Sequence, residues 1–338
     1  MPIIHFLNVK QGDCSIIEHG SGRVTVIDVC NAGPIDIVSE TVDASFAKRE
    51  KGIAGNFKQK EYPVNPVSYL KKHGIDSVFR FVATHPDMDH LDGIKHFFET
   101  FEPSNFWDTN NNEEKTFEEG SPFNQEDWDF YKSLRDATSD IAVKRLTLHS
   151  GARGKYYNQT EEGKGGGDGL SILASTPELV TNANECGDYN DCSYVILYRC
   201  NGLKVVFGGD SHDETWEHIL KTHEEDVSDI DLLIAPHHGR DSGRSYDFLD
   251  VLKPKMTFFG NANSEHLAYD KWNTRKLAFI TNNQAGCMIA DGEDKTGMDI
   301  YVTHEPFAKS ANPFTYYSEI HKAYFYKSLA KARAKSAS

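Results

Sequence analysis

Short apolar runs alternate with polar turns along most of this chain. The runs are rich in β-branched and aromatic residues and too short for buried helices, so they predict strands. Helical spacing of apolar residues occurs over 91–101, in a segment that ends near His73, and around Trp128 and Tyr131. The predicted strands lie near residues 3–9, 14–18, 23–29, 77–84, 143–149, 170–175, 193–199, 204–208, 230–235 and 256–260.

Predicted strands and candidate ligand residues occupy the chain from residue 3 to about residue 300 without a linker, which indicates one α/β domain over residues 1–305. Two polar insertions interrupt it, at about 33–62 and 102–142, and the first is interpreted as a long loop. Residues 306–338 are predicted to form a C-terminal helix with a basic tail, because aromatic and aliphatic residues recur there at near-helical spacing. These residues are Tyr316, Ile320 and Tyr324, and Lys327 continues the same spacing.

The segment from His85 to His90 gathers four candidate metal ligands in one turn: His85, Asp87, Asp89 and His90. It follows a predicted strand and precedes a predicted helix, so its side chains are exposed at the carboxyl end of the strand. Alternate residues His85, Asp87 and Asp89 can point into one pocket. The start of the helix also favours a carboxylate at Asp89, because unpaired backbone donors and the helix dipole lie there.

Three later strands are followed by residues of the same chemical type. Asp210 comes directly after the run that ends at Phe207 and two glycines, and His237 and His238 come after the strand at 230–235. His266 follows the strand at 256–260. A polar turn that is rich in His and Asp by chance would not be accompanied by three such strand ends.

In these motifs the chain resembles the metallo-β-lactamase superfamily, and within it the branch of the hydrolase domain of the DNA-uptake protein ComEC. That branch carries H-x-D-x-D-H where most of the superfamily carries H-x-H-x-D-H. The resemblance covers roughly residues 3–300 and extends to an opening strand, turn and strand, a third strand, an Asn-x-x-Ser segment, a Gly-Asp motif and a His-His-Gly motif. These are residues 6–17, Thr25–Asp28, Asn190–Ser193, Gly208–Asp210 and His237–Gly239.

The resemblance implies a hydrolase domain that is a four-layer αββα sandwich. This domain carries the two insertions and contains a two-metal site. The resemblance makes His85, Asp87 and Asp210 ligands of one ion, and Asp89, His90, Asp210 and His266 ligands of the other. No histidine between residues 90 and 210 fits the usual third ligand motif well; His149 is a candidate, but a structural role at a strand end suits it better. His237 or His238 could fill that position or act as a proton donor, and the sequence leaves both open.

Three aspartates in this ligand set favour harder ions than zinc alone. We therefore expect two divalent ions, Mn²⁺ or Zn²⁺ with Mg²⁺ also suitable, and activity with manganese at least equal to that with zinc. Two such ions can activate a shared water and hold the attacking and leaving oxygens of a phosphodiester. Asp87 or Asp89 would help to orient the water, and His237 or His238 would protonate the leaving group.

The net charge of −15 opposes general binding to a polyanion. Bound ions would neutralise part of that charge. Arg240, one residue past the His-His-Gly motif, could meet a phosphate at the rim, and Asn190 is a second candidate for substrate binding; an ordinary surface role for Arg240 is equally consistent. Nucleic acid is the expected substrate, no membrane partner is expected, and the C-terminal helix could contact a protein partner.

Six cysteines show no C-x-x-C pair, and no segment has the length of a signal peptide or a membrane span, so a cytoplasmic protein is expected. Three functions remain open. The first is a metal-dependent phosphodiesterase, most simply a nuclease acting on DNA or RNA. The second is a hydrolase of a small phosphodiester, a cyclic nucleotide or a lactone, and the third is a non-catalytic sensor or assembly subunit with a structural metal site.

Overall fold

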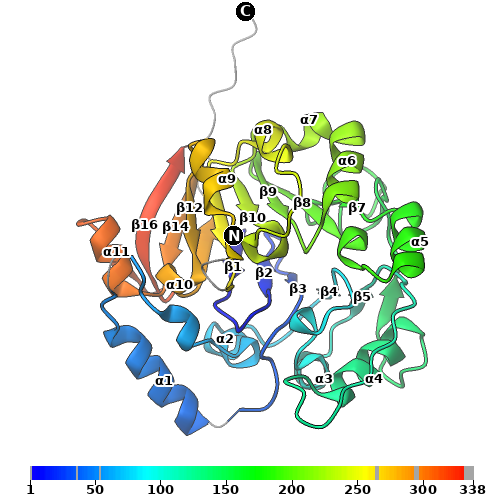
Figure 1. Ribbon diagram of the computed structural model, residues 1–338, viewed down its shortest axis with the longest axis horizontal. Helices are drawn as coiled ribbons and strands as arrows, with labels where there is room; N and C mark the ends of the chain where they lie inside the picture. The colour runs from blue at the N-terminus through cyan, green and yellow to red at the C-terminus, as the bar shows by residue number, and fades with distance from the viewer. Residues whose placement is uncertain (1, 36, 53–54, 263–265, 293–296, 331–338) are drawn as a thin grey trace, which may run out of the picture.

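Two β-sheets pack face to face in the computed structural model, which describes residues 2–35, 37–52, 55–262, 266–292 and 297–330 (Figure 1). The first sheet has the strand order β15-β16-β14-β13-β1-β2-β3-β4-β5-β6 and the second has the order β12-β11-β10-β9-β8-β7. The strands of the first sheet are β1 (Ile3–Phe6), β2 (Ser15–Glu18), β3 (Val24–Ile27), β4 (Arg80–Val82), β5 (Asn105–Trp107), β6 (Lys144–Leu146), β13 (Met288–Asp291), β14 (Gly297–Val302), β15 (Tyr317–Ser318) and β16 (Ala323–Ala330). Those of the second are β7 (Leu170–Ala174), β8 (Val195–Cys200), β9 (Leu203–Phe207), β10 (Leu232–Ile234), β11 (Met256–Phe259) and β12 (Phe279–Thr281).

Both sheets are mixed, and each has a parallel half. Strands β3 to β6 pair in parallel in the first sheet, and β9 to β12 do so in the second. The helices are α1 (Ile37–Arg49), α2 (Pro66–Lys72), α3 (Ile94–Phe101), α4 (Gln125–Arg135), α5 (Pro177–Cys186), α6 (Asp213–Thr222), α7 (Glu224–Val227), α8 (Phe248–Leu252), α9 (Tyr269–Thr274), α10 (Asn282–Ala285) and α11 (Glu305–Ala311). Short 3₁₀ turns lie at Gln59–Glu61, Met88–His90, Asn190–Cys192 and Pro236–Gly239.

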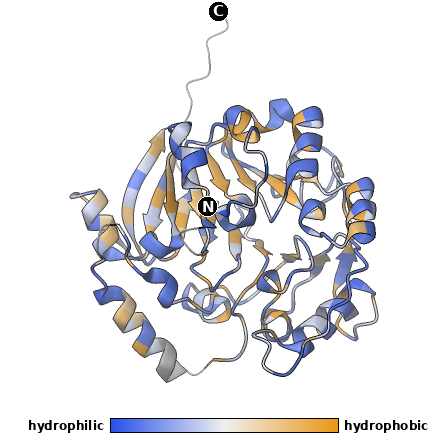
Figure 2. Ribbon diagram, viewed as in Figure 1, coloured by the Kyte–Doolittle hydropathy of each residue, from blue (hydrophilic) through white to orange (hydrophobic). Residues whose placement is uncertain are grey.

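Three hydrophobic layers show why the strands are apolar along their whole length. On β10, Leu232 and Ile234 face the core between the sheets, whereas Leu233 faces the outer helices. Since successive strand residues point to opposite faces, a strand covered on both sides has no polar face. Helices α2, α3 and α4 cover the first sheet, and α6, α8 and α9 cover the second (Figure 2). The predicted four-layer αββα sandwich is confirmed.

The C-terminal segment was wrongly predicted as a helix. After α11 the chain forms the short strand β15 and then β16, which pairs antiparallel with β14 at the edge of the first sheet. Tyr324 and Tyr326 pack against the core between the sheets, while Phe325 packs on the opposite face. The aromatic residues therefore follow the two-residue period of a strand, which their β-propensity also favours. The tail at 331–338 lies outside the described residues.

The first insertion is also not the simple loop that was predicted, because it contains α1 and the turn Gln59–Glu61. Val42 and Phe46 on α1 are about half exposed, at 47% and 54%. Apolar and polar residues are also not segregated to opposite faces of α1, so the pattern by which a packed helix is recognised in a sequence is absent. In the second insertion, α4 matches the helix predicted around Trp128 and Tyr131, and it contributes both side chains to the outer core.

Candidate metal centre

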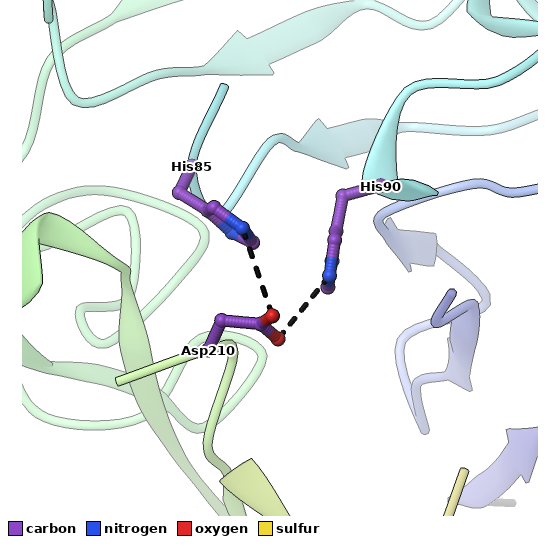
Figure 3. Close-up of side chains that lie close together, drawn as sticks. All are labelled: His85, His90 and Asp210. Atoms are coloured by element: carbon purple, nitrogen blue, oxygen red, sulfur yellow. Dashed lines mark ion pairs between the residues drawn. The ribbon is translucent and has the colours of Figure 1, made fainter. Parts of the chain in front are cut away.

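The carboxyl ends of parallel strands from both sheets bring the predicted ligands together. The turn after β4 carries His85 and His90, the turn after β9 carries Asp210, and the turn after β10 carries His237 and His238. Figure 3 shows the side chains of His85 and His90 directed at the carboxylate of Asp210. Three overlapping clusters of candidate ligands result: His85–His90–Asp210, Asp89–His90–His238 and Asp13–Asp210–His238.

Distances around Asp210 suit atoms that share a cation. Its Oδ1 lies 3.2 Å from Nε2 of His90, and its Oδ2 lies 3.9 Å from Nε2 of His85 and 3.6 Å from Nε2 of His238. Asp89 Oδ2 lies 3.4 Å from Nε2 of His238. Ligands bound tetrahedrally at about 2.1 Å from zinc lie about 3.4 Å from one another. The observed spacing agrees with this arrangement.

Each of the three clustered histidines is oriented by an acceptor on its other ring nitrogen. Nδ1 of His90 donates to Asp28 at 2.8 Å, and Nδ1 of His238 donates to Asp13 at 2.8 Å. Nδ1 of His85 lies 3.0 Å from the hydroxyl of Thr84, whose own proton goes to Asp28 at 2.7 Å, so here the ring must donate. Every Nε2 lone pair is thus directed to the cluster, as in metal sites with ordered outer partners.

These Nε2 atoms have no other partner. Nε2 of His85, His90 and His238 and Oδ1 of Asp210 are buried and make no hydrogen bond within the described part of the chain. A buried polar atom without a partner costs about 1–3 kcal/mol, so four at one point indicate that a ligand satisfies them. The residues present therefore fit a divalent cation.

The pKa shifts of the histidines at the centre also indicate a site for a cation. Burial alone lowers the pKa of His238, yet the carboxylates of Asp210 and Asp13 raise it to about 10. The pKa of His90 is likewise raised, against the effect of burial, by Asp210 and Asp28. His237 differs: burial, with the neighbouring charges of His238 and Arg244, lowers its pKa to about 3. Carboxylate charge at this centre thus needs a cation, which a metal ion would supply.

Asp87 lies at the edge of the centre rather than within the three clusters. Its Oδ2 is 3.6 Å from Nε2 of His85, and its Oδ1 is 2.5 Å from Nζ of Lys115. Lys115 belongs to the second insertion and also donates to the carbonyl oxygen of Pro86 at 3.0 Å. Although burial would raise the pKa of Asp87, His85 and Lys115 hold it below its usual range.

Other predicted residues stand apart from the clusters. His266 is exposed, its carbonyl oxygen accepts from the backbone of Asp241, and the residues just before it, 263–265, lie outside the described part. Of the two histidines between which the sequence left a ligand role open, His238 belongs to two of the clusters, because the turn after β10 carries it inward. Arg240 is exposed, and Asn190 is half-buried with its Oδ1 unpaired. His149 is half-buried and belongs to none of the three clusters.

Several residues of the centre had no assigned role in the sequence. Asp28 directly follows β3 and Asp13 lies in the turn between β1 and β2, so the signal that could have found them is again a carboxylate beside a predicted strand. That turn presses closely on the ligand segment, since a Cβ on Gly12 would lie 1.7 Å from the carbonyl oxygen of Asp89. Lys115 and Arg244 carry no such signal, because only tertiary packing brings them to the site.

A cavity of about 590 Å³ opens beside the clusters at Asp89. The first insertion contributes Lys60 and Glu61 to its wall, and the second contributes Pro122 and Phe123. Cavities of about 300–1,000 Å³ are typical of pockets for small ligands. Both insertions therefore help to shape the space next to the candidate ligands.

No helix in the described part of the chain is both long and apolar enough to cross a membrane. No protein-family model and no curated protein sequence matches the chain.

Solved structures that the chain resembles include Igni18, a novel metallo hydrolase from the archaeon Ignicoccus hospitalis, with 10% identity and a TM-score of 0.48 over 86% of this chain and 100% of that one. A new diphosphatase from the PhnP family has 12% identity and a TM-score of 0.39 over 82% and 94% of the two chains. Unliganded yeast PDE1 has 9% identity and a TM-score of 0.40 over 83% and 98%. Because these similarities are distant, the side chains of this chain must indicate what the site can do.

Proposed function

We propose that this protein is a metal-dependent hydrolase of the metallo-β-lactamase fold that cleaves phosphodiester bonds. The observation that carries the proposal is the convergence, at strand ends from both sheets, of four buried ligand atoms that have no hydrogen-bond partner among the described residues: Nε2 of His85, His90 and His238, and Oδ1 of Asp210. Imidazole nitrogen and carboxylate oxygen together are ligands for zinc and manganese. The ComEC-like order of motifs in the sequence is consistent with such a hydrolase.

Two ions are proposed, with Asp210 shared between them. His85, His90 and Asp210 form one of the clusters and would hold one ion. His238, whose Nε2 lies 3.4 Å from Oδ2 of Asp89 and 3.6 Å from Oδ2 of Asp210, would hold the other together with these two carboxylates. His90 lies in two clusters, but its single Nε2 lone pair serves one ion. When bound, the ions supply an activated water and neutralise the charge that develops on the phosphate. Asp89 and Asp87 have oxygens at the rim that can accept hydrogen bonds from a water and orient it.

Zinc suits this ligand set as well as manganese does. The expectation of a carboxylate-rich site depended on Asp87 as a ligand, whereas the clusters contain His238 and not Asp87. Three imidazoles with one carboxylate fewer than expected shift the preference back towards zinc. We therefore propose Zn²⁺ or Mn²⁺ as the native ion, with Mg²⁺ less suited to the three nitrogens.

A small phosphodiester is the substrate that the cavity beside Asp89 favours. Its walls come from both insertions, and its volume of about 590 Å³ suits a compact ester. The overall charge of −15 also opposes a polyanion. Nucleic acid is the second candidate, because Lys10 and Lys60 line the same cavity and Lys115 pairs with Asp87 at the edge of the centre.

Hydrolysis assays with the metal-stripped and reloaded protein test both candidates. We expect hydrolysis of bis(p-nitrophenyl) phosphate after addition of Zn²⁺ or Mn²⁺. Asp210→Asn should lower kcat by roughly 100-fold or more, because the variant loses a charged ligand shared by both ions. Asp270→Asn, the same change on an exposed carboxylate, should leave kcat unchanged.

The same metal-reloaded protein can be used to determine the substrate class. Cleavage of a cyclic nucleotide but not of single-stranded DNA, double-stranded DNA or RNA would support the small-ester assignment, and the reverse result would support the nuclease. Tight metal binding with no hydrolysis of any phosphodiester would overturn the proposal. It would then favour a lactone substrate or a non-catalytic subunit.

A further inference from the structure

One histidine near Asp210 is oriented differently from the others. The clustered rings donate their Nδ1 protons to Asp28, Asp13 or Thr84, which leaves Nε2 free to bind an ion. His237 instead has its Nδ1 at 2.8 Å from a guanidinium nitrogen of Arg244. Its Nε2 lies 3.7 Å from Oδ2 of Asp210, on the side of the metal centre.

This contact fixes the tautomer of His237. An arginine side chain has only donors, so Nδ1 of His237 must accept and the ring proton must be on Nε2. The hydroxyl of Ser242 and Nε2 of His212 also lie 3.3 Å from the same Nδ1. A neutral ring with a proton on Nε2 has no lone pair there, and therefore cannot bind an ion through that atom.

Arg244 is itself held rigidly. It is 6% exposed, its guanidinium donates to the carbonyl oxygen of Ser211, and two of its nitrogens donate to the hydroxyl of Ser242 at 3.0 and 2.8 Å. Ser211 directly follows Asp210, so one arginine connects the turn after β9 with that after β10. A buried guanidinium with several partners keeps its orientation, and the ring that accepts from it keeps its orientation too.

We propose that His237 is not a metal ligand but a neutral hydrogen-bond donor to the substrate, and that Arg244 is the residue that positions it. This inference rests on the proposed phosphodiesterase function. Nε2–H of His237 faces the centre beside Asp210, where a phosphate oxygen of the substrate would lie. His238, the adjacent residue in the chain, is the ligand, because its Nδ1 donates to Asp13.

The same geometry changes the role expected for His237. A neutral imidazole that gave up its Nε2 proton would become an imidazolate, which is far too basic to form here, so His237 does not deliver a proton to the leaving group. It stabilises the negative charge that grows on a phosphate oxygen by a fixed hydrogen bond. No covalent change occurs at the ring, and the proton stays on Nε2 throughout.

The tautomer can be measured without any substrate. In the zinc-loaded protein labelled with ¹⁵N-histidine, we expect the His237 ring, assigned by its loss in His237→Gln, to show a protonated Nε2 and an unprotonated Nδ1. Arg244→Met should abolish this preference, whereas Arg240→Met, at an exposed arginine, should not change it. A His237 ring with a protonated Nδ1, or with Nε2 bound to zinc, would overturn the proposal.

Measurements of metal content and kinetics distinguish the role of His237 from that of His238. His238→Ala should lose bound zinc, whereas His237→Ala and Arg244→Met should keep the zinc content of the wild type. These two variants should lower kcat for bis(p-nitrophenyl) phosphate about 10- to 100-fold and weaken binding of inorganic phosphate, because the first loses the donor to the phosphate and the second loses the group that orients this donor. His237→Gln should recover part of the loss, since its amide nitrogen can reach the position of Nε2. Loss of zinc in His237→Ala would contradict the proposal.

Other results are expected if the proposed phosphodiesterase function is wrong. A wild type that hydrolyses no phosphodiester but shows the expected tautomer and metal content would count against phosphodiester cleavage while keeping His237 outside the ligand set. A wild type that is active, with His237→Ala and Arg244→Met equally active, would leave the phosphodiesterase in place and remove the donor role. Thermal unfolding of each variant identifies any that fails to fold.

Discussion

Lys115 and Asp87 show how one residue from an insertion alters a site that a motif defines. The lysine nitrogen lies 2.5 Å from the Asp87 carboxylate, and this carboxylate lies 3.6 Å from Nε2 of His85. A fixed positive charge so close to the centre opposes the binding of cations. Removing it in Lys115→Met should therefore tighten metal binding about tenfold, because partly buried charges are weakly screened.

Competition with a metal-binding dye measures this affinity. Lys132→Met is the matched control, since Lys132 lies in the same insertion and pairs with Glu114 on the surface. It should leave the affinity unchanged. Weaker metal binding in Lys115→Met would show that the lysine organises the Asp87 carboxylate rather than competing with the ion.

At the level of elements, β16 belongs to the sandwich rather than lying on it as a separate helix. Leu329 is 6% exposed and is part of the core between the sheets, whereas Lys327 on the same strand is exposed. Leu329→Ala should lower the free energy of unfolding by about 2–3 kcal/mol, the lower part of the range for buried leucines, because the site is near a sheet edge. Denaturant unfolding measures this change.

Lys327→Ala should change the free energy of unfolding by less than about 0.5 kcal/mol, as expected for an exposed position. Both variants should keep the KM of the wild type, since β16 contributes no residue to the metal centre. Equal stability of the two variants would show that the strand is not part of the cooperative core. The terminal segment would then be an accessory to the sandwich.

For the whole molecule, the metal centre is a link between the two sheets. His85 and His90 follow β4 in the first sheet, and Asp210 and His238 follow β9 and β10 in the second. An ion held by both groups binds the folded state and not the unfolded chain. It should therefore stabilise the protein by about 2.7 kcal/mol at a free concentration 100 times its Kd.

Thermal unfolding with and without a chelator measures this linkage. Chelation should lower Tm, and addition of Zn²⁺ or Mn²⁺ to the metal-free protein should restore it. Asp210→Asn should show a much smaller shift, because it loses the carboxylate common to two of the clusters. An equal Tm with and without metal in the wild type would mean that no ion bridges the sheets.

Sequence alone determined the strands that are covered on both faces, because their continuous apolar runs are local and need no knowledge of partners. It also placed His85, Asp89, His90, Asp210 and His238 at strand ends, since a polar residue directly after such a run marks the edge of a sheet. The four-layer order followed only from the resemblance of these motifs to a family.

Tertiary structure decided what depends on contacts between distant segments. It selected His238 for the clusters, joined Asp13 and Asp28 to their histidines, and paired β16 with β14. The orientation of His237 by Arg244 could not be predicted from the sequence either, because the partner beside a ring nitrogen decides whether that nitrogen carries the proton. Local patterns fix which face of an element is apolar, but the geometry of a site depends on packing between elements that the chain order does not specify.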